Sequence, residues 1–480
     1  MVGVLKGRPR AAVGLVMSTP PDGNPPVAAA ASPTDAALPL PCPSRPAAIA
    51  IPTLLPGPIE DLERIESLDA LRGVAVCGIL FVNIQFFAFP FFETTSNEWD
   101  DLSFLDAAAR LFVSIFFELK FITLFSLMFG AGLAVQMARA QRAGRGFVGH
   151  YSRRLAILLA IGLIHGILLW YGDILASYAV LGFAALLFRN CRNATLVVWA
   201  ALLALVPLAL VVPFAVISPG ADWHSDNWVG KFGHGAAAWA APDDSANPIQ
   251  TLFRFMDDET RVYTTGTWLE IVLLRALYFT ATGVSAFFTL YLWRCLAMFL
   301  IGIAVFRAGL FAPTPAHRRR MTRFLPVGLI LGLVLESAGE YIRLTRGDVA
   351  WAIATHFTCQ YFGSAMLALA YAAGVVLLMT CAGGGGILRR LVPFGRMALT
   401  NYLGHSIICG IIFYWPGLRL FGAVSNARLI GIVIGILVVQ VMFCAWWLRR
   451  YRLGPMEWIW RSATYLRLQP MRRGRESTAI

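Results

Sequence analysis

Continuous apolar runs of about 18 to 25 residues recur along this chain, the first beginning at Leu71 and the last ending at Leu448. Each run is long enough to cross a hydrocarbon layer about 30 Å thick as a helix. Membrane-spanning strands would instead require a closed barrel and would show alternating apolar and polar residues. The runs therefore predict an all-α fold, a polytopic bundle of transmembrane helices.

The composition agrees with a chain that lies mostly in lipid. Of the 480 residues, 58% are hydrophobic and only 14% are charged, whereas soluble domains contain about 25% charged residues. The net charge of +13 would suit nucleic acid, but the arginines flank the apolar runs, as the positive-inside rule describes. We therefore expect the lipid bilayer and a small-molecule substrate as partners and no nucleic acid, while the oligomeric state stays open.

Ten spans are predicted, with both the N-terminus and the C-terminus in the cytoplasm. This orientation places all the basic clusters on one side of the membrane. The predicted spans cover residues 71–89, 121–138, 153–170, 173–189, 195–217, 291–311, 323–342, 355–381, 397–414 and 428–448.

The spans form two halves of five. The start of the chain is rich in proline and alanine, which predicts a disordered tail and leaves Met17 as an alternative start. Interfacial helices are expected over 102–120 and 268–289, the second being either interfacial or re-entrant. The predicted domains are a tail (1–60), an N-terminal half (61–217), an external loop with the interfacial helix (218–290), a C-terminal half (291–465) and a basic tail (466–480).

The first span carries the first cluster of polar residues. Ionisable side chains inside spans cost at least about 2.5–3.5 kcal/mol on insertion, so each is a candidate for function. Asp69 and Arg72 are three residues apart and can pair on one helix face, and Asn83 lies deeper in the same span. These residues either belong to a substrate site, or they begin a capped helix with a snorkelling arginine.

The third span carries the second cluster, formed by His165 and Asp173. Gly172 is expected to turn the chain between the third and fourth spans, so that the two side chains can face each other. An imidazole oriented by a carboxylate is the usual arrangement of a general base. The alternative is a structural hydrogen bond, with Asp173 as the N-cap of the next helix.

The ninth span carries the third cluster. Asn401 and His405 are four residues apart and share a helix face, and Arg396 lies at the cytoplasmic end, where it can meet an anionic group such as a phosphate. The alternative is a snorkelling arginine and an interhelical asparagine.

The other ionisable residues of the spans are predicted to lie at the membrane surface. Lys120 is expected to anchor the interface, and Glu336, Glu340 and His356 are expected at wet helix ends. The histidines show no ligand spacing and the cysteines no CxxC pairing, so we expect neither a metal site nor a disulfide framework. No phosphate-binding or dinucleotide motif is present, which argues against a permanently bound cofactor.

Several segments resemble the YeiB-like membrane proteins, a family whose C-terminal part is catalogued as a domain of unknown function. The resemblance covers nearly all of the chain after residue 60 and implies a protein of the bacterial cytoplasmic (inner) membrane. The matching segments are Ser67–Gly73 with Asn83, Leu124–Gly132, His165–Leu175, Gly395–Tyr402, and Gly454–Trp458 with Trp460 and Arg461.

The YeiB-like family is in turn similar to a superfamily of transmembrane acyltransferases that includes heparan-alpha-glucosaminide N-acetyltransferase. Members move an acyl group from a cytoplasmic donor, typically acyl-CoA, to an acceptor on the far side. Their first span carries a comparable Asp-x-x-Arg-Gly and a later Val-Asn, which implies that Asp69, Arg72 and Asn83 belong to a site. Their catalytic histidine follows the first span, but the first histidine here is His150, so either His165 has taken that role or acyl transfer has been lost.

Two functions follow as hypotheses. The first is a membrane acyltransferase that uses acyl-CoA as a co-substrate. The second is a transporter or exporter of a small or amphipathic solute, because polar residues on several spans can line a path. In the acyltransferase, the expected roles are general base for His165 with Asp173, phosphate binding for Arg396, and a substrate channel for Asp69, Arg72, Asn83, Asn401 and His405.

Overall fold

The computed structural model describes residues 65–95, 102–144, 146–217, 258–288, 291–311, 314–346, 349–380 and 385–472. The predicted N-terminal tail, most of the predicted external loop and the end of the predicted basic tail lie outside the described residues. Within the described ranges the regular structure is helical, apart from an isolated β-bridge between Tyr451 and Arg472.

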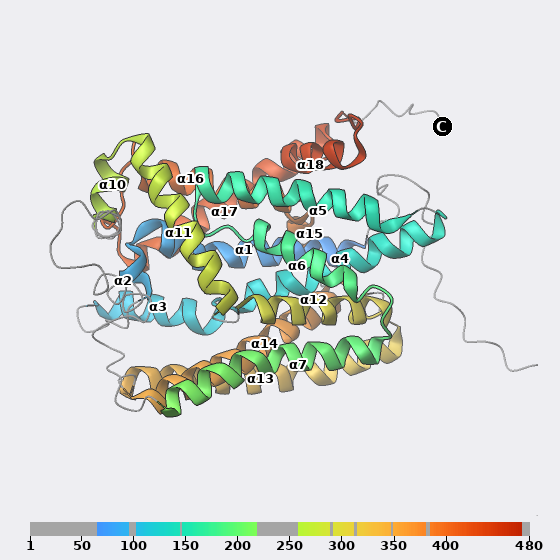
Figure 1. Ribbon diagram of the computed structural model, residues 1–480, viewed down its shortest axis with the longest axis horizontal. Coiled ribbons are helices and arrows are strands. Elements are labelled where there is room, and N and C mark those ends of the chain that lie inside the picture. The colour runs from blue at the N-terminus through green and yellow to red at the C-terminus, as the bar shows by residue number, and fades with distance from the viewer. Residues whose placement is uncertain are drawn as a thin grey trace, which may run out of the picture. The chain divides into compact units, whose positions relative to one another are not determined.

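Seven helical segments are long and apolar enough to cross a membrane. Figure 1 shows them running in a common direction, horizontal in this view, which confirms the predicted all-α membrane bundle. They are built from α1 (Glu66–Ala88), α3 (Phe104–Phe116) with α4 (Lys120–Arg142), α5 (Phe147–Ile164) with the π-helix η2 (His165–Leu169), α7 (Asn193–Ile217), α13 (Pro315–Arg346), α14 (Ala350–Thr380) and α17 (Asn426–Arg450).

Three of the predicted spans are shorter helices. They are α6 (Leu175–Leu187), α12 (Tyr291–Arg307) and α16 (Ala398–Phe413), with 13, 17 and 16 residues. Irregular segments precede α6 and follow α16, so fewer residues are helical than the apolar runs suggest. All three lie among the long helices in Figure 1.

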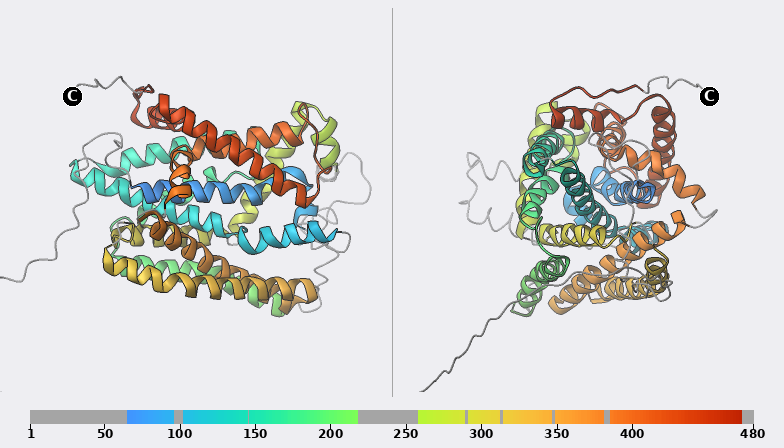
Figure 2. Two further views of the ribbon diagram at one scale, coloured as in Figure 1. Left: turned by 180° about the vertical axis from the view of Figure 1, so that it is seen from behind. Right: turned by 90° about the vertical axis from the view of Figure 1, so that its right-hand side faces the viewer.

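The second span is preceded by a separate helix, as the sequence predicted, but this helix does not lie where it was expected. Helix α3 is capped by Ser103, whose side chain accepts a hydrogen bond from the Asp106 backbone N–H. It ends before Leu119, which has a φ of 59°, and α4 begins at the next residue. Figure 2 (left) shows α3 and α4 nearly end to end, so the helix predicted to lie at the interface over 102–120 extends the direction of α4.

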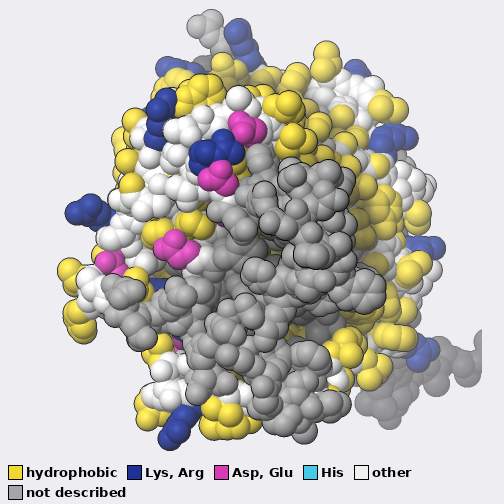
Figure 3. Space-filling view, turned by 60° about the vertical axis from the view of Figure 1, so that its left-hand side comes forward, with side chains coloured by type: hydrophobic (Ala, Val, Ile, Leu, Met, Phe, Trp, Pro, Cys, Tyr) yellow, Lys and Arg dark blue, Asp and Glu magenta, His cyan; other side chains and the backbone are white. Residues whose placement is uncertain are grey.

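Short helices mark the two ends of the bundle. Helices α2 (Phe91–Thr95) and α10 (Glu259–Thr265) lie at one end, and α18 (Pro455–Tyr465) lies at the other with the start of α5. Helix α11 (Trp268–Phe288), predicted as the interfacial or re-entrant segment, crosses the long helices obliquely in Figure 1. Figure 3 brings the α10 end forward and shows several acidic side chains there, with hydrophobic side chains over the flanks.

Helices α1 and α15 (Gly386–Arg396) touch backbone to backbone. A Cβ atom on Gly395 would lie 1.8 Å from the carbonyl oxygen of Asp69, and one on Gly73 would lie 2.6 Å from that of Leu391. Only glycine permits such an approach. This contact explains the glycine that follows Arg72 and the glycine that precedes Arg396. It also brings these two arginines to the same region.

Candidate active site

His165 begins the π-helical turn η2 at the end of α5. The Trp170 backbone N–H donates to the His165 carbonyl at 2.9 Å, five residues back, and single π turns are frequent at functional sites. The chain then leaves the helix and returns before α6, which brings Asp173 against α5. Gly162 makes room for this return, since a Cβ there would lie 2.8 Å from Asp173 Oδ2.

Three side chains form one hydrogen-bonded row. His165 Nδ1 lies 2.8 Å from Asp173 Oδ1, and His165 Nε2 lies 2.8 Å from Ser406 Oγ. Asp173 Oδ2 also accepts the Ala176 backbone N–H at 2.7 Å, so Asp173 caps α6 and orients the imidazole at once. An ionised carboxylate only accepts, so Nδ1 carries the proton and the Ser406 hydroxyl donates to Nε2.

The row is buried and is held by Tyr402. His165 and Ser406 are 1% and 3% exposed. The Tyr402 hydroxyl donates to the Gly172 carbonyl and accepts from the Ile174 N–H, both at 3.3 Å, which holds the loop that carries Asp173. Its ring lies 5.2 Å from the imidazole.

A cavity of about 470 Å³ lies between α1, α4, α5, α6, α15, α16 and α18. It is lined over residues 147–158 of α5, a length of about 16 Å at 1.5 Å per residue, or half of a hydrocarbon core about 30 Å thick. Its inner wall is mainly apolar and includes Ile79, Phe125, Leu158, Ile174 and Tyr402. Because Ile174 follows Asp173 and the Tyr402 ring packs near His165, this wall lies next to the hydrogen-bonded row.

The outer part of the cavity is basic. Five half-buried arginines line it, namely Arg72, Arg139, Arg154, Arg396 and Arg461. Cations gathered beside an apolar chamber favour an anionic ligand, because arginine forms strong, directional hydrogen bonds to phosphate and carboxylate.

Some of these arginines are oriented by neighbouring groups. Arg72 Nη1 lies 2.9 Å from Asp69 Oδ1, as the spacing of the two residues predicted. The Arg154 guanidinium lies 3.5 Å from the centre of the Trp460 ring, and the Trp460 indole N–H donates to the Arg154 carbonyl at 2.9 Å. Stacking of this kind leaves the edge of a guanidinium available for a ligand.

Glu457 is an acidic residue on the wall of the same cavity. Its carboxylate accepts the backbone N–H groups of Leu399 at 2.7 Å and Thr400 at 3.1 Å, so it caps the N-terminus of α16. Burial raises the pKa of this carboxyl. A Cβ on Gly454 would lie 2.2 Å from Glu457 Oε2, which explains the glycine of the Gly-Pro-Met-Glu segment.

The other predicted site residues lie away from the lining of this cavity. Asn401 Nδ2 donates to the Phe394 carbonyl at 2.9 Å, and its Oδ1 accepts from Cys444 Sγ at 3.2 Å, so Asn401 joins α15, α16 and α17. His405 is buried, and neither ring nitrogen has a hydrogen-bond partner among the described residues. Asn83 is half-buried in α1.

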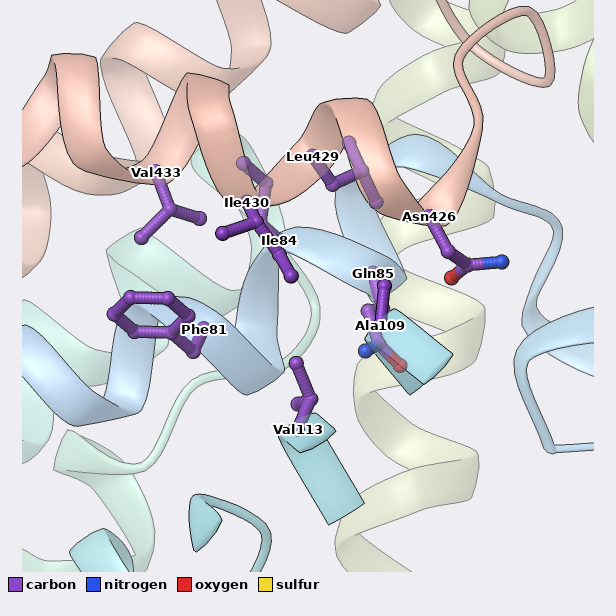
Figure 4. Close-up of a pocket in the computed structure, with 9 residues that line it drawn as sticks. All are labelled: Phe81, Ile84, Gln85, Ala109, Val113, Asn426, Leu429, Ile430 and Val433. Atoms are coloured by element: carbon purple, nitrogen blue, oxygen red, sulfur yellow. The ribbon is translucent and has the colours of Figure 1, made fainter. Parts of the chain in front are cut away.

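A second, much smaller pocket lies between α1, α3 and α17 (Figure 4). Its volume of about 10 Å³ is near the minimum for one water molecule. Gln85 and Asn426 carry the amide groups among its otherwise apolar lining. It is too small for a substrate.

Comparison with known proteins places this architecture in a family. Residues 305–467 match a family model described as a protein of unknown function (DUF418). An uncharacterized protein of Bacillus subtilis, YxaH, is 34% identical over 426 residues, which cover 85% of this chain and 96% of YxaH. The chain belongs to the YeiB-like family.

Other relatives agree with this assignment. YeiB of Escherichia coli, also an uncharacterized protein, is 29% identical over 418 residues, which cover 84% of this chain and 97% of YeiB. An uncharacterized 39.9 kDa protein of Bacillus acidopullulyticus is 26% identical over 424 residues, with 86% and 97% covered. These relatives are bacterial, and the apolar helices mark this YeiB-like protein as a membrane protein.

The YeiB-like protein also contains a buried charge cluster that the sequence analysis placed wrongly at the membrane surface. Lys120 Nζ lies 2.7 Å from Glu336 Oε2 and donates to the Ser114 carbonyl at 2.6 Å. The side chains of Lys120 and Glu336 are 0% and 1% exposed. Glu340 is buried too, accepts from the Ser114 hydroxyl and accepts from Arg343 Nε at 2.9 Å. The break between α3 and α4 and the packing of α13 remove these groups from the surface.

Arg294 in the first turn of α12 extends the polar interior and was missed by sequence reasoning. Its Nη2 donates to Thr123 Oγ1 and to Ser364 Oγ, each at 2.8 Å, and its guanidinium lies 4.8 Å from the Tyr361 ring centre. The signal in the sequence that could have revealed it was a lone arginine beside an apolar run.

His356, predicted at a wet helix end, is half-buried. No group of metal-ligating side chains occurs in the part of the chain that is described.

Proposed function

We propose that this YeiB-like protein is a transmembrane acyltransferase of the bacterial cytoplasmic membrane. It takes an acyl group from cytoplasmic acyl-CoA and transfers it to a hydroxyl or amine acceptor at or across the membrane. The observation that carries the proposal is a single cavity that is basic at its outer end, apolar inside, and closed by Tyr402 and Ile174 beside His165.

The cavity matches the chemistry of an acyl-CoA. CoA carries a 3′-phosphate and a pyrophosphate, and five arginines face the outer part of the cavity. Arg396 and Arg72 come from helices that meet at the Gly73–Gly395 contact, so two elements hold the phosphates in fixed positions. The cavity follows α5 for about 16 Å, and its apolar inner part receives the end of the pantetheine arm and the acyl chain.

His165 supplies the base in this proposal. Its Nδ1 proton is held by Asp173, so Nε2 is the basic nitrogen. A neutral imidazole accepts a proton at the ring nitrogen that carries none. Asp173 keeps the ring in the tautomer that the reaction requires and stabilises the imidazolium that forms.

Binding of acyl-CoA to the purified full-length protein in detergent tests the proposal. Acetyl-CoA and longer acyl-CoAs should bind to wild type and bind at least about tenfold more weakly to Arg396→Ala, because one charge-assisted contact contributes about 1.5–3 kcal/mol. Arg449→Ala is the matched control, since Arg449 is exposed at the end of α17 and outside the cavity. In His165→Ala, binding should persist while transfer is lost.

The buried charge cluster around Lys120 and Glu336 favours a second function, transport of a small or amphipathic solute. Ionisable groups inside a membrane bundle often mark solute or proton pathways. In that case a proteoliposome assay should show solute flux that is lost in Glu336→Gln and unaffected in Arg396→Ala. Absence of acyl-CoA binding together with such flux would replace the acyltransferase by a transporter.

A further inference from the structure

The Ser406 hydroxyl is hydrogen-bonded differently from several other serine and threonine hydroxyls inside the bundle. A serine within a helix commonly donates to the carbonyl four residues earlier. Ser126, Thr358 and Ser364 do this, each to its own helix. In the described part of the chain, the hydrogen bond of the Ser406 hydroxyl runs instead to His165 Nε2 at 2.8 Å, across to another helix.

The hydrogen bond occupies the one nitrogen that can act as a base. Asp173 accepts the Nδ1 proton, so a proton taken up by His165 must arrive at Nε2, where Ser406 Oγ already lies. A hydroxyl, an imidazole and a carboxylate in this order form the arrangement that activates a serine nucleophile. Such a constellation is recognised by its geometry and not by chain order.

Ser406 is also placed next to the cavity. Tyr402 lines the cavity and precedes Ser406 by four residues, so the two lie on the same face of α16. Ile174 lines it too and directly follows Asp173. The reactive row therefore stands immediately behind the inner wall, where a thioester at the end of the pantetheine arm would arrive.

We propose that Ser406 is a catalytic nucleophile that carries the acyl group as an acyl-serine ester between donor and acceptor. This inference rests on the proposed acyltransferase function. Ser406 Oγ bonds to the thioester carbonyl carbon while its proton passes to His165 Nε2. The carbon–sulfur bond then breaks, and the CoA thiolate takes that proton and leaves as the thiol.

The second half of the reaction reverses the proton path. His165 accepts a proton from the acceptor hydroxyl or amine as that oxygen or nitrogen attacks the acyl-serine carbonyl. The ester bond to Ser406 breaks, and Oγ recovers its proton from His165. Donor and acceptor therefore react in turn, which lets the cytoplasmic cavity release CoA before the acceptor reacts.

The test is covalent labelling of the full-length protein in detergent with acetyl-CoA and palmitoyl-CoA labelled in the acyl group, without acceptor. Wild type should retain label on the peptide that contains Ser406. Ser406→Ala should lose the label, and His165→Ala should form it at least roughly a thousandfold more slowly. Ser364→Ala, which removes another buried hydroxyl, should be labelled as wild type is.

Ser406→Cys provides a second readout that depends on the chemistry of the adduct. Its adduct should be a thioester, cleaved by neutral hydroxylamine, whereas the wild-type oxyester should resist it. Acyl-CoA binding and transfer to an acceptor are measured on the same samples. Transfer that persists in Ser406→Ala without any adduct would overturn the acyl-serine step and leave the acyltransferase standing, whereas no acyl-CoA binding by wild type would overturn both.

Discussion

Substitution of Lys120 should lower the free energy of unfolding, because it breaks the buried ion pair with Glu336. Lys120 Nζ and Glu336 Oε2 are 2.7 Å apart, which corresponds to an attraction of about 6 kcal/mol at an effective dielectric constant of about 20. Desolvation of both ions opposes this attraction, and in Lys120→Met the carboxylate of Glu336 would remain buried without its cation. The expected loss in free energy of unfolding is about 3–5 kcal/mol.

A double variant distinguishes the cost of an unpaired buried charge from the cost of losing the Lys120 side chain itself. Lys120→Met combined with Glu336→Leu removes both charges and should recover most of the lost stability, because apolar replacements of buried pairs are often neutral or stabilising. The measurement is reversible unfolding in mixed detergent micelles titrated with sodium dodecyl sulfate. Arg261→Ala, which breaks an exposed pair with Asp258, is the control and should leave the unfolding midpoint nearly unchanged. A Lys120→Met variant as stable as this control, or a double variant no more stable than the single one, would show that an unpaired Glu336 carboxylate is not the cause of the loss.

Two further predictions concern packing and pH. Gly395→Ala should destabilise the protein by about 3 kcal/mol, the upper end of the usual cost of overpacking, since its Cβ would meet the Asp69 carbonyl at 1.8 Å. Gly431→Ala, where nothing lies within 4 Å of the new Cβ, should leave the stability unchanged. Equal melting temperatures for the two variants would contradict the contact. Burial raises the pKa of Glu259 from 4.5 to about 7. The stability that this raised pKa contributes is therefore complete below about pH 4.5 and is lost as the pH rises to about 7, by roughly 3 kcal/mol. The free energy of unfolding in detergent should fall across this pH range in wild type and not in Glu259→Gln. Identical pH dependence in the two proteins would contradict the raised pKa.

Much of the fold follows from the apolar runs, because the length of a run decides whether a helix can cross lipid. The break at Leu119 falls at the boundary expected between the helix over 102–120 and the span 121–138. The sequence did not show, however, that α3 continues the direction of α4 instead of lying at the interface (Figure 2). For the same reason Lys120 was assigned to the surface.

The candidate site was partly accessible from the sequence. His165 and Asp173 are eight residues apart with a glycine between them, so their 2.8 Å contact could be anticipated from local geometry. Ser406 is 241 residues from His165, and nothing local distinguishes it from other serines in apolar helices. The partnership of Lys120 with Glu336 is equally remote in the chain, and only the packing of α13 against its neighbours reveals it.

The most direct test of the account is equilibrium binding of palmitoyl-CoA to the purified protein, compared between wild type, Arg396→Ala and the exposed control Arg449→Ala. Saturable binding is expected for wild type and for Arg449→Ala, and binding at least about tenfold weaker is expected for Arg396→Ala. Added salt should weaken binding, because phosphate contacts with half-buried arginines are partly screened. No saturable binding to wild type, or equal binding to all three proteins, would contradict the assignment of the basic cavity to acyl-CoA.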